Sequence, residues 1–164
     1  MENSQVTLQD VDPGVFELFI DWSYNGRLES LTAWRAKYTG ANEYSTNRFL
    51  AMVYIFADRF LVLRLKREIL VESVEYVNLV RNISVPPGRR LIRYVFGSLP
   101  ESDPYLQFFV DRHCRRWRLK HHKGRKEGEK GFEDMPGEFI VRMMHTYCKM
   151  DRKHEKSLRV EDYL

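Results

Sequence analysis

Five side chains of the types that bind zinc lie in the C-terminal part of the chain: Cys114, His121, His122, His145 and Cys148. His145 and Cys148 are three residues apart, so on a helix they would share one face and could reach one ion. Cys114 and His121 could supply a second pair. The sequence has no C-x-x-C pair, however, and the flanking residues are those of ordinary helix cores. We therefore expect buried cysteines and surface histidines, and no metal site.

Catalytic motifs give no better candidate. No serine is flanked by the glycines of a nucleophile elbow. The segment GRKEGEKG, residues 124–131, has lysines and glycines, but it lacks the preceding strand and the Gly-Lys-Ser/Thr ending of a phosphate-binding loop. We expect no enzymatic activity and no cofactor.

A basic segment, residues 112–130, has the sequence RHCRRWRLKHHKGRKEGEK. Such a run can bind nucleic acid or act as a nuclear import signal, but cations at a helix C-terminus are also stabilised there and stay solvated. Two glutamates dilute the charge, and Trp117 alone makes no stacking platform for bases. We favour the solvated helix end and keep a basic, nucleic-acid-binding function as the alternative. The cations of this possible patch are Arg112, Arg115, Arg116, Arg118, Lys120, Lys123, Arg125 and Lys126.

Composition fits a folded chain of 164 residues, because 43% of them are hydrophobic and 13% aromatic. The formal net charge of +4 is small, so the placement of the charges matters more than their sum. Two cysteines make no disulfide framework, and the polar start MENSQVTLQD lacks the apolar region of a secretory signal. We expect a cytoplasmic or nuclear protein that has no membrane association.

The elements that must position these residues are mainly helices. Alternation over residues 5–9 predicts one strand with one buried face. Asp12-Pro13 starts a helix and Asn25-Gly26 ends it, yet nearly all the residues between are apolar. Further helices are expected at about 46–61, 63–80, 88–97, 104–119 and 136–149. The last should turn Phe139, Ile140, Met143, Met144 and Tyr147 inward, and the tail after Met150 should fray.

Several segments together resemble a known family. Two stretches are similar to the second half of a BTB/POZ domain of the type abundant in filamentous fungi. The first is VDPGVFELFIDWSYNGRL, residues 11–28, and the second is ADRF, residues 57–60, followed by LK, residues 65–66. LIRYVFGSLPESDPYLQFFVD and MPGEFIVRMMHTYC are similar to the helices that follow in that branch. The resemblance implies a mainly α chain, the C-terminal helical part of an α+β BTB/POZ fold, with one N-terminal strand and a C-terminal helical extension.

The resemblance also implies a domain plan. Residues 1–85 would be a partial BTB/POZ domain, 86–150 a helical extension and 151–164 a polar tail. The strand–helix unit, hairpin and His-containing helix that open a complete BTB domain have no counterpart here. We therefore expect some helices to have apolar faces that would pack against elements which this sequence does not encode. The usual BTB homodimer is doubtful for the same reason.

The function that follows from the resemblance is non-catalytic protein–protein interaction. In BTB adapters of cullin-type ubiquitin ligases, an apolar-x-Glu motif and a later tyrosine on the corresponding helix line the cullin-facing groove. The matching residues here are Val15, Phe16, Glu17 and Tyr24. Two alternatives stay open: the basic nucleic-acid-binding protein, and an incomplete product without independent function.

Overall fold

The structure, a computed structural model, describes residues 10–29, 33, 37, 43–79, 86–116, 134–149 and 158–164. Within these residues it contains six α-helices and no strand, so the mainly helical class is confirmed. The strand expected at residues 5–9 lies outside the described residues, and the BTB/POZ fold stays a prediction. The chain forms two compact units, Met1–Ile69 and Leu70–Leu164, which divide within one helix. The domain plan 1–85, 86–150 and 151–164 likewise stays a prediction.

The first helix, α1 (Pro13–Asn25), begins and ends as its sequence predicts. Asp12 Oδ1 accepts hydrogen bonds from the backbone N–H groups of Gly14 and Val15, at 2.9 and 3.3 Å. Proline follows at the first helical position, where its missing N–H is harmless. Gly26 ends the helix at φ 67°, a left-handed conformation that glycine adopts without a Cβ clash.

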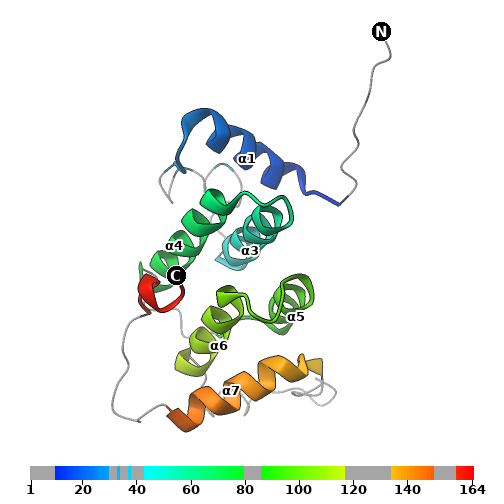
Figure 1. The fold of residues 1–164 in the computed structure, drawn as a ribbon, viewed down its shortest axis with the longest axis vertical. Helices are drawn as coiled ribbons and strands as arrows, with labels where there is room; N and C mark the ends of the chain where they lie inside the picture. Colours follow the sequence, from blue (N-terminus) through cyan, green and yellow to red (C-terminus); the bar gives the residue numbers. More distant parts are fainter. Residues whose placement is uncertain are drawn as a thin grey trace. The chain divides into compact units, whose positions relative to one another are not determined.

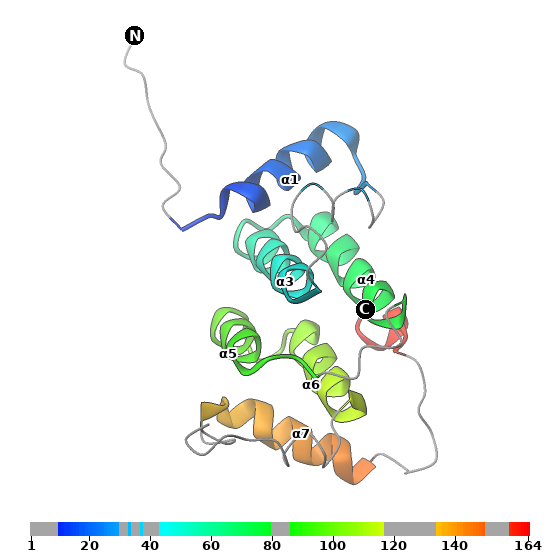
Figure 2. The same ribbon diagram turned by 180° about the vertical axis from the view of Figure 1, so that it is seen from behind.

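In the first unit, α1 packs on α3 (Glu43–Arg59) (Figure 1). The buried side chains of α3 point in several directions around the helix, which confirms the prediction of a central helix: Thr46, Phe49, Leu50, Ala51, Val53, Tyr54, Phe56 and Ala57. Figure 2 shows from behind that α1 also lies across the beginning of α4 (Leu63–Leu79). The predicted inner face of α4 is buried at Leu65 and Ile69 in this unit and at Tyr76 and Val77 in the second.

The second unit contains α5 (Arg89–Ser98), α6 (Pro104–Arg116) and α7 (Gly137–Lys149), and α6 packs against both of the others (Figure 1). Asp103 caps α6, since its Oδ1 accepts a hydrogen bond from the Tyr105 N–H at 2.9 Å. Tyr105 is fully enclosed and shares a 2.9 Å hydrogen bond with Ser73 Oγ. Most side chains of α6 are buried, around the greater part of the helix, so α6 forms the core of this unit.

The described end of the tail does not fray, so that expectation is wrong for residues 158–164. The segment ends in a short 3₁₀ helix, η4 (Val160–Asp162). Leu158 and Tyr163 are both buried, at 4% exposure each. The Leu158 carbonyl accepts a hydrogen bond from Asn78 Nδ2 at 3.0 Å, and the Tyr163 ring meets Phe108 edge-on at 5.7 Å. Two apolar side chains thus hold an otherwise polar segment on the second unit.

Among the helices described, none combines the length and apolar character that a membrane crossing requires.

Candidate protein-binding surface

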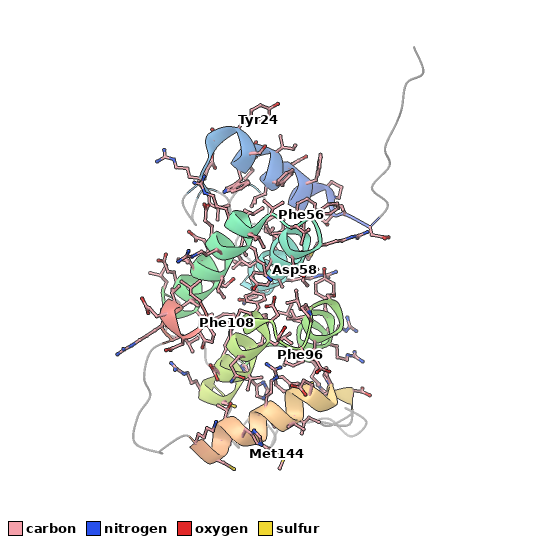
Figure 3. The ribbon with its side chains drawn as sticks, in the orientation of Figure 1. Tyr24, Phe56, Asp58, Phe96, Phe108 and Met144 are labelled. Carbon is pink, nitrogen blue, oxygen red and sulfur yellow. The ribbon has the colours of Figure 1, made fainter. Side chains whose placement is uncertain are left out.

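The four residues matched to the cullin-binding motif divide between the two sides of α1. Val15 is 2% exposed and, with Leu18, faces the core of the first unit. Glu17 and Tyr24 are exposed, and their separation of two helical turns puts them on one face. Tyr24 is the most open aromatic side chain described, at 86% exposure, and Figure 3 shows it pointing away from α3. Phe16, at 39%, lies between the two sides.

A series of ring contacts joins Phe16 to the end of α3. The ring centroids of Phe16 and Phe19 are 6.2 Å apart, those of Phe19 and Phe56 5.3 Å, and those of Phe56 and Phe60 4.6 Å. The inner members hold the outer two in place, since Phe56 is buried between α1 and α3 (Figure 3). Phe16 and Phe60, both about two-fifths exposed, are the accessible ends of this series. Aromatic side chains that are rigid before binding lose little entropy on binding, which favours them as anchors.

The turn after α3 adds a second exposed apolar group. Leu61 is 79% exposed and Leu63 is 69% exposed. Leu61 has φ 56°, in the left-handed region that leucine rarely adopts. The turn holds it there through hydrogen bonds from the N–H of Leu61 to the Asp58 carbonyl and from the N–H of Val62 to the Ala57 carbonyl. These two bonds form the motif that ends many helices, with leucine at the left-handed position where glycine is usual.

We call Phe16, Glu17, Tyr24, Phe60 and Leu61 the α1 surface. Sequence reasoning found the first three and missed Phe60 and Leu61, because ADRF was interpreted as part of a buried helix. The apolar triplet Phe60-Leu61-Val62 between two helices was the available signal, since a link of that length cannot bury every side chain.

The C-terminal end of α1 is fastened to α4 by a polar cluster. Trp22 Nε1 donates a hydrogen bond to Glu68 Oε2 at 2.9 Å, and Arg64 Nε is 3.0 Å from Glu68 Oε1. Arg64 also donates to the Gly26 carbonyl and lies over the Trp22 ring, at 5.9 Å from its centroid. These contacts fix the orientation of the helix that carries Glu17 and Tyr24.

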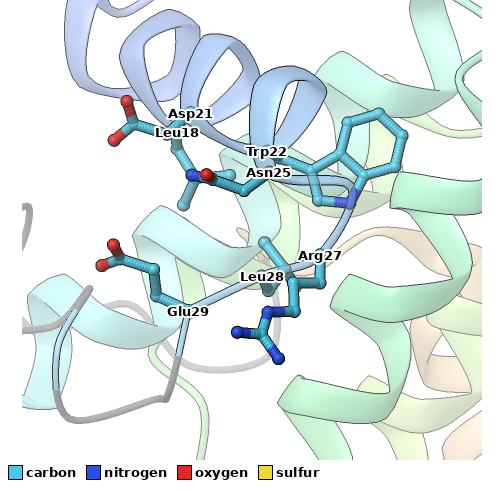
Figure 4. A pocket seen from close by; sticks show the side chains of 7 residues that line it. All are labelled: Leu18, Asp21, Trp22, Asn25, Arg27, Leu28 and Glu29. Atoms are coloured by element: carbon cyan, nitrogen blue, oxygen red, sulfur yellow. The ribbon is translucent and has the colours of Figure 1, made fainter.

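A small pocket lies beside this cluster (Figure 4). Its volume of about 10 Å³ is enough for about one water molecule and far below that of a small-molecule site. On its wall, the Asp21 carboxylate forms an ion pair with Lys37. The pocket therefore adds nothing to the binding capacity of the α1 surface. It is lined by Leu18, Asp21, Trp22, Asn25, Arg27, Leu28 and Glu29.

The proposed basic patch is only partly described. Arg112 is 5% exposed, so the expectation of a solvated helix end is wrong for this residue. Arg112 follows Phe109 by three residues and Tyr105 by seven, which puts it on the buried side of α6. Arg115 is half-buried, and Arg116 is described only as the end of α6. The other members, Arg118, Lys120, Lys123, Arg125 and Lys126, lie outside the described residues.

The candidate zinc ligands have different environments. Cys114 is buried and its Sγ lies 3.8 Å from the Met143 carbonyl, whereas His145 and Cys148 are exposed. The expectation of a buried cysteine is thus right for Cys114 and wrong for Cys148. His121 and His122 are outside the described residues, and among those described no three His, Cys, Asp or Glu side chains are grouped to hold a metal.

Comparisons with protein-family models, with curated proteins and with solved structures found no match to this chain.

Proposed function

We propose that the chain is a non-catalytic protein–protein interaction module of BTB/POZ type, which presents the α1 surface to a cullin-type ubiquitin-ligase scaffold. The observation that carries the proposal is that Phe16, Glu17 and Tyr24 are exposed on α1, a helix whose C-terminal end is fastened to α4 through Glu68 and Arg64. The sequence resemblance supplies the class of partner.

The arrangement has the properties of a binding hot spot. Large apolar side chains with one carboxylate beside them can bury area and fix orientation together. Phe16 and Phe60 are held by neighbouring rings, so their positions are set before a partner arrives. Val15 supports this surface from inside, since it lies in the core between α1 and the rest of the unit.

A binding assay with an immobilised cullin N-terminal domain tests the proposal. The full chain should bind, and Tyr24→Ala and Glu17→Arg should each weaken binding by about tenfold or more, as expected for a hot-spot residue. Both side chains are exposed, so neither change should alter the fold.

Two matched control substitutions are at residues outside the α1 surface. Tyr94→Ala removes a partly exposed tyrosine on α5, and Glu75→Arg reverses an exposed charge on α4. Both should bind like the unaltered chain. If Tyr24→Ala and Glu17→Arg bind as the controls do, the α1 surface is not the docking site. If the unaltered chain does not bind at all, the cullin class of partner is wrong.

A further inference from the structure

The segment of residues 158–164 is held on the second unit in the way that a short bound peptide is held. Leu158 and Tyr163 are buried, at 4% exposure each, whereas Val160 is half-buried and the other four side chains are exposed. Figures 1 and 2 show η4, which belongs to this segment, beside the C-terminal end of α4. Two buried anchors with mostly exposed residues between them are typical of peptide recognition.

Three side chains outside the segment receive it. Asn78 Nδ2, on α4, donates a 3.0 Å hydrogen bond to the Leu158 carbonyl. On α6, the Phe108 ring meets the Tyr163 ring edge-on, with 5.7 Å between the centroids, and Asp111 Oδ2 accepts a 2.8 Å hydrogen bond from Tyr163 Oη. A ring and a carboxylate together therefore contact both the apolar body and the hydroxyl group of the tyrosine.

The receiving side chains on α6 are also held by contacts that do not involve the segment. Gln107 Nε2 donates hydrogen bonds to Asp111 Oδ1 at 2.8 Å and to Thr146 Oγ1, on α7, at 3.2 Å. The Phe108 ring is stacked on the Tyr105 ring, with 5.3 Å between the centroids. Because these contacts remain when the segment leaves, the site is formed in advance, and binding to it costs little conformational entropy.

The sequence before the segment supplies no further apolar anchor. Residues 151–157 read DRKHEKS, in which every side chain is polar. Burial of apolar area is the main force that fixes a segment on a core. The attachment of residues 158–164 therefore depends mainly on Leu158 and Tyr163, and a segment with so few anchors should open at a lower free energy than the helices beneath it.

We propose that Asn78, Phe108 and Asp111 form a peptide-binding site whose ligand is the segment 158–164. The segment binds reversibly, so that the same segment of a second copy can take its place. The class of ligand is a peptide with a leucine and, five residues later, a tyrosine. The inference concerns the second unit alone and is independent of the α1 surface.

A capped, fluorescently labelled peptide of residues 157–164, SLRVEDYL, tests the site with its ligand as a separate molecule. Tyr163→Ala in the full chain removes the ring that occupies the site. Fluorescence anisotropy should therefore show saturable binding of the peptide to this variant. The unaltered chain should bind the peptide at least about tenfold more weakly, because its own segment competes at a high effective concentration.

Changes in the peptide and in the site should be coupled. Tyr163→Phe in the peptide should weaken binding about fivefold, since one hydrogen bond is lost. Asp111→Ala, added to the Tyr163→Ala chain, should weaken binding of the unaltered peptide by a similar factor and should remove the effect of Tyr163→Phe. Tyr163→Ala in the peptide should abolish binding.

Each change has a matched control. Leu164→Ala in the peptide should bind like the unaltered peptide, because Leu164 is 60% exposed. Met144→Ala, added to the Tyr163→Ala chain, should leave binding unchanged. Met144 was expected to point inward, but it is 60% exposed, and Figure 3 shows it directed away from α5 and α6. The proposal is overturned if the folded Tyr163→Ala chain does not bind the peptide, or if the Leu164→Ala and Tyr163→Ala peptides bind alike.

Hydrogen exchange in the unaltered chain tests the proposal even if the Tyr163→Ala variant does not fold. The N–H groups of Asp162 and Tyr163 donate to the carbonyls of Arg159 and Val160 within the segment, so their exchange reports its release. They should exchange at least about tenfold faster than the amides of α6 and more slowly than in the free peptide. Exchange at the rate of α6 would make the segment an integral part of the unit, and exchange at the free-peptide rate would show that the site does not hold it. Either result overturns the proposal.

Discussion

The indole N–H of Trp22 donates a 2.9 Å hydrogen bond to the carboxylate of Glu68, 46 residues further along the chain. The bond connects the last turns of α1 with the second turn of α4. Arg64 approaches the same carboxylate and lies over the same indole ring, so Trp22, Arg64 and Glu68 form a cluster of three side chains. This cluster sets the orientation of α1 and therefore of Tyr24.

Replacing Trp22 with Phe should therefore lower the stability of the first unit. The change removes the hydrogen bond and leaves Glu68 with Arg64 as its partner, so the free energy of unfolding should fall by about 1–2 kcal/mol. Urea unfolding followed by circular dichroism measures the change. Ser23→Ala, at an exposed position next to Trp22, is the control and should change stability by less than about 0.5 kcal/mol.

Leu61→Gly should separate stability from binding. Glycine adopts φ 56° without the Cβ clash that leucine has there, so the variant should gain about 1 kcal/mol in stability. It should bind a cullin N-terminal domain more weakly than the unaltered chain, because 79% of the Leu61 side chain is exposed on the α1 surface. Urea unfolding and the binding assay give the two values. Leu63→Gly, within α4, should instead be destabilised, and a Leu61→Gly variant that loses stability would show that the strain is absent.

The C-terminal segment should contribute to the stability of the second unit. Tyr163 Oη donates a 2.8 Å hydrogen bond to Asp111 Oδ2. Tyr163→Phe removes only this bond and should lower the free energy of unfolding by about 1 kcal/mol. Tyr163→Ala also removes the ring from Phe108 and should lower it by about 3 kcal/mol or more. Thermal unfolding distinguishes the two, and Leu164→Ala, at an exposed position, should have no measurable effect.

The chain should lose stability in alkaline solution. Burial, with a smaller contribution from the nearby Asp111 carboxylate, raises the pKa of the Cys114 thiol from 9.0 to about 12. Burial also raises the pKa of Tyr105 and of Tyr163 above the usual range. Above pH 9 the unfolded chain releases protons that the folded chain keeps, so the free energy of unfolding falls as the pH rises toward 12.

Urea midpoints at several pH values from 8 to 10.5 check this prediction, and Cys114→Ala should show a shallower decline. Thiol labelling provides a second measurement. Cys148 is exposed and should react quickly at mildly alkaline pH, whereas buried Cys114 should react only as the chain unfolds. Equal labelling rates for the two thiols would contradict the burial of Cys114.

The helices were predictable because their local signals agree with their packing. Asp12-Pro13 and Gly26 set the ends of α1, and Asp103-Pro104 starts α6, through contacts within a few residues. The inner face of α4 at Leu65 and Ile69 was predictable from helical spacing alone, because the opposite face is charged.

The face of a helix is harder to predict when both sides are apolar. Met144 and Met143 are adjacent on α7, and composition alone does not say which of them lies in the core. Arg112 was expected in solvent because it is charged, yet the structure buries it. Its spacing of seven residues from buried Tyr105 indicated the buried side of α6. The exposure of Leu61 depends on the path of the turn between α3 and α4. The apolar triplet Phe60-Leu61-Val62 indicates that some side chain of this link is exposed, but it does not indicate which one.

The most direct measurement of the central claim is the change in backbone amide NMR resonances of the labelled chain as a cullin N-terminal domain is added. We expect the largest changes at Phe16, Glu17, Tyr24 and Leu61, while the amides of α5 and α7 change little. A titration in which binding is seen but the amides of α1 and of the following turn are unaffected would contradict this expectation.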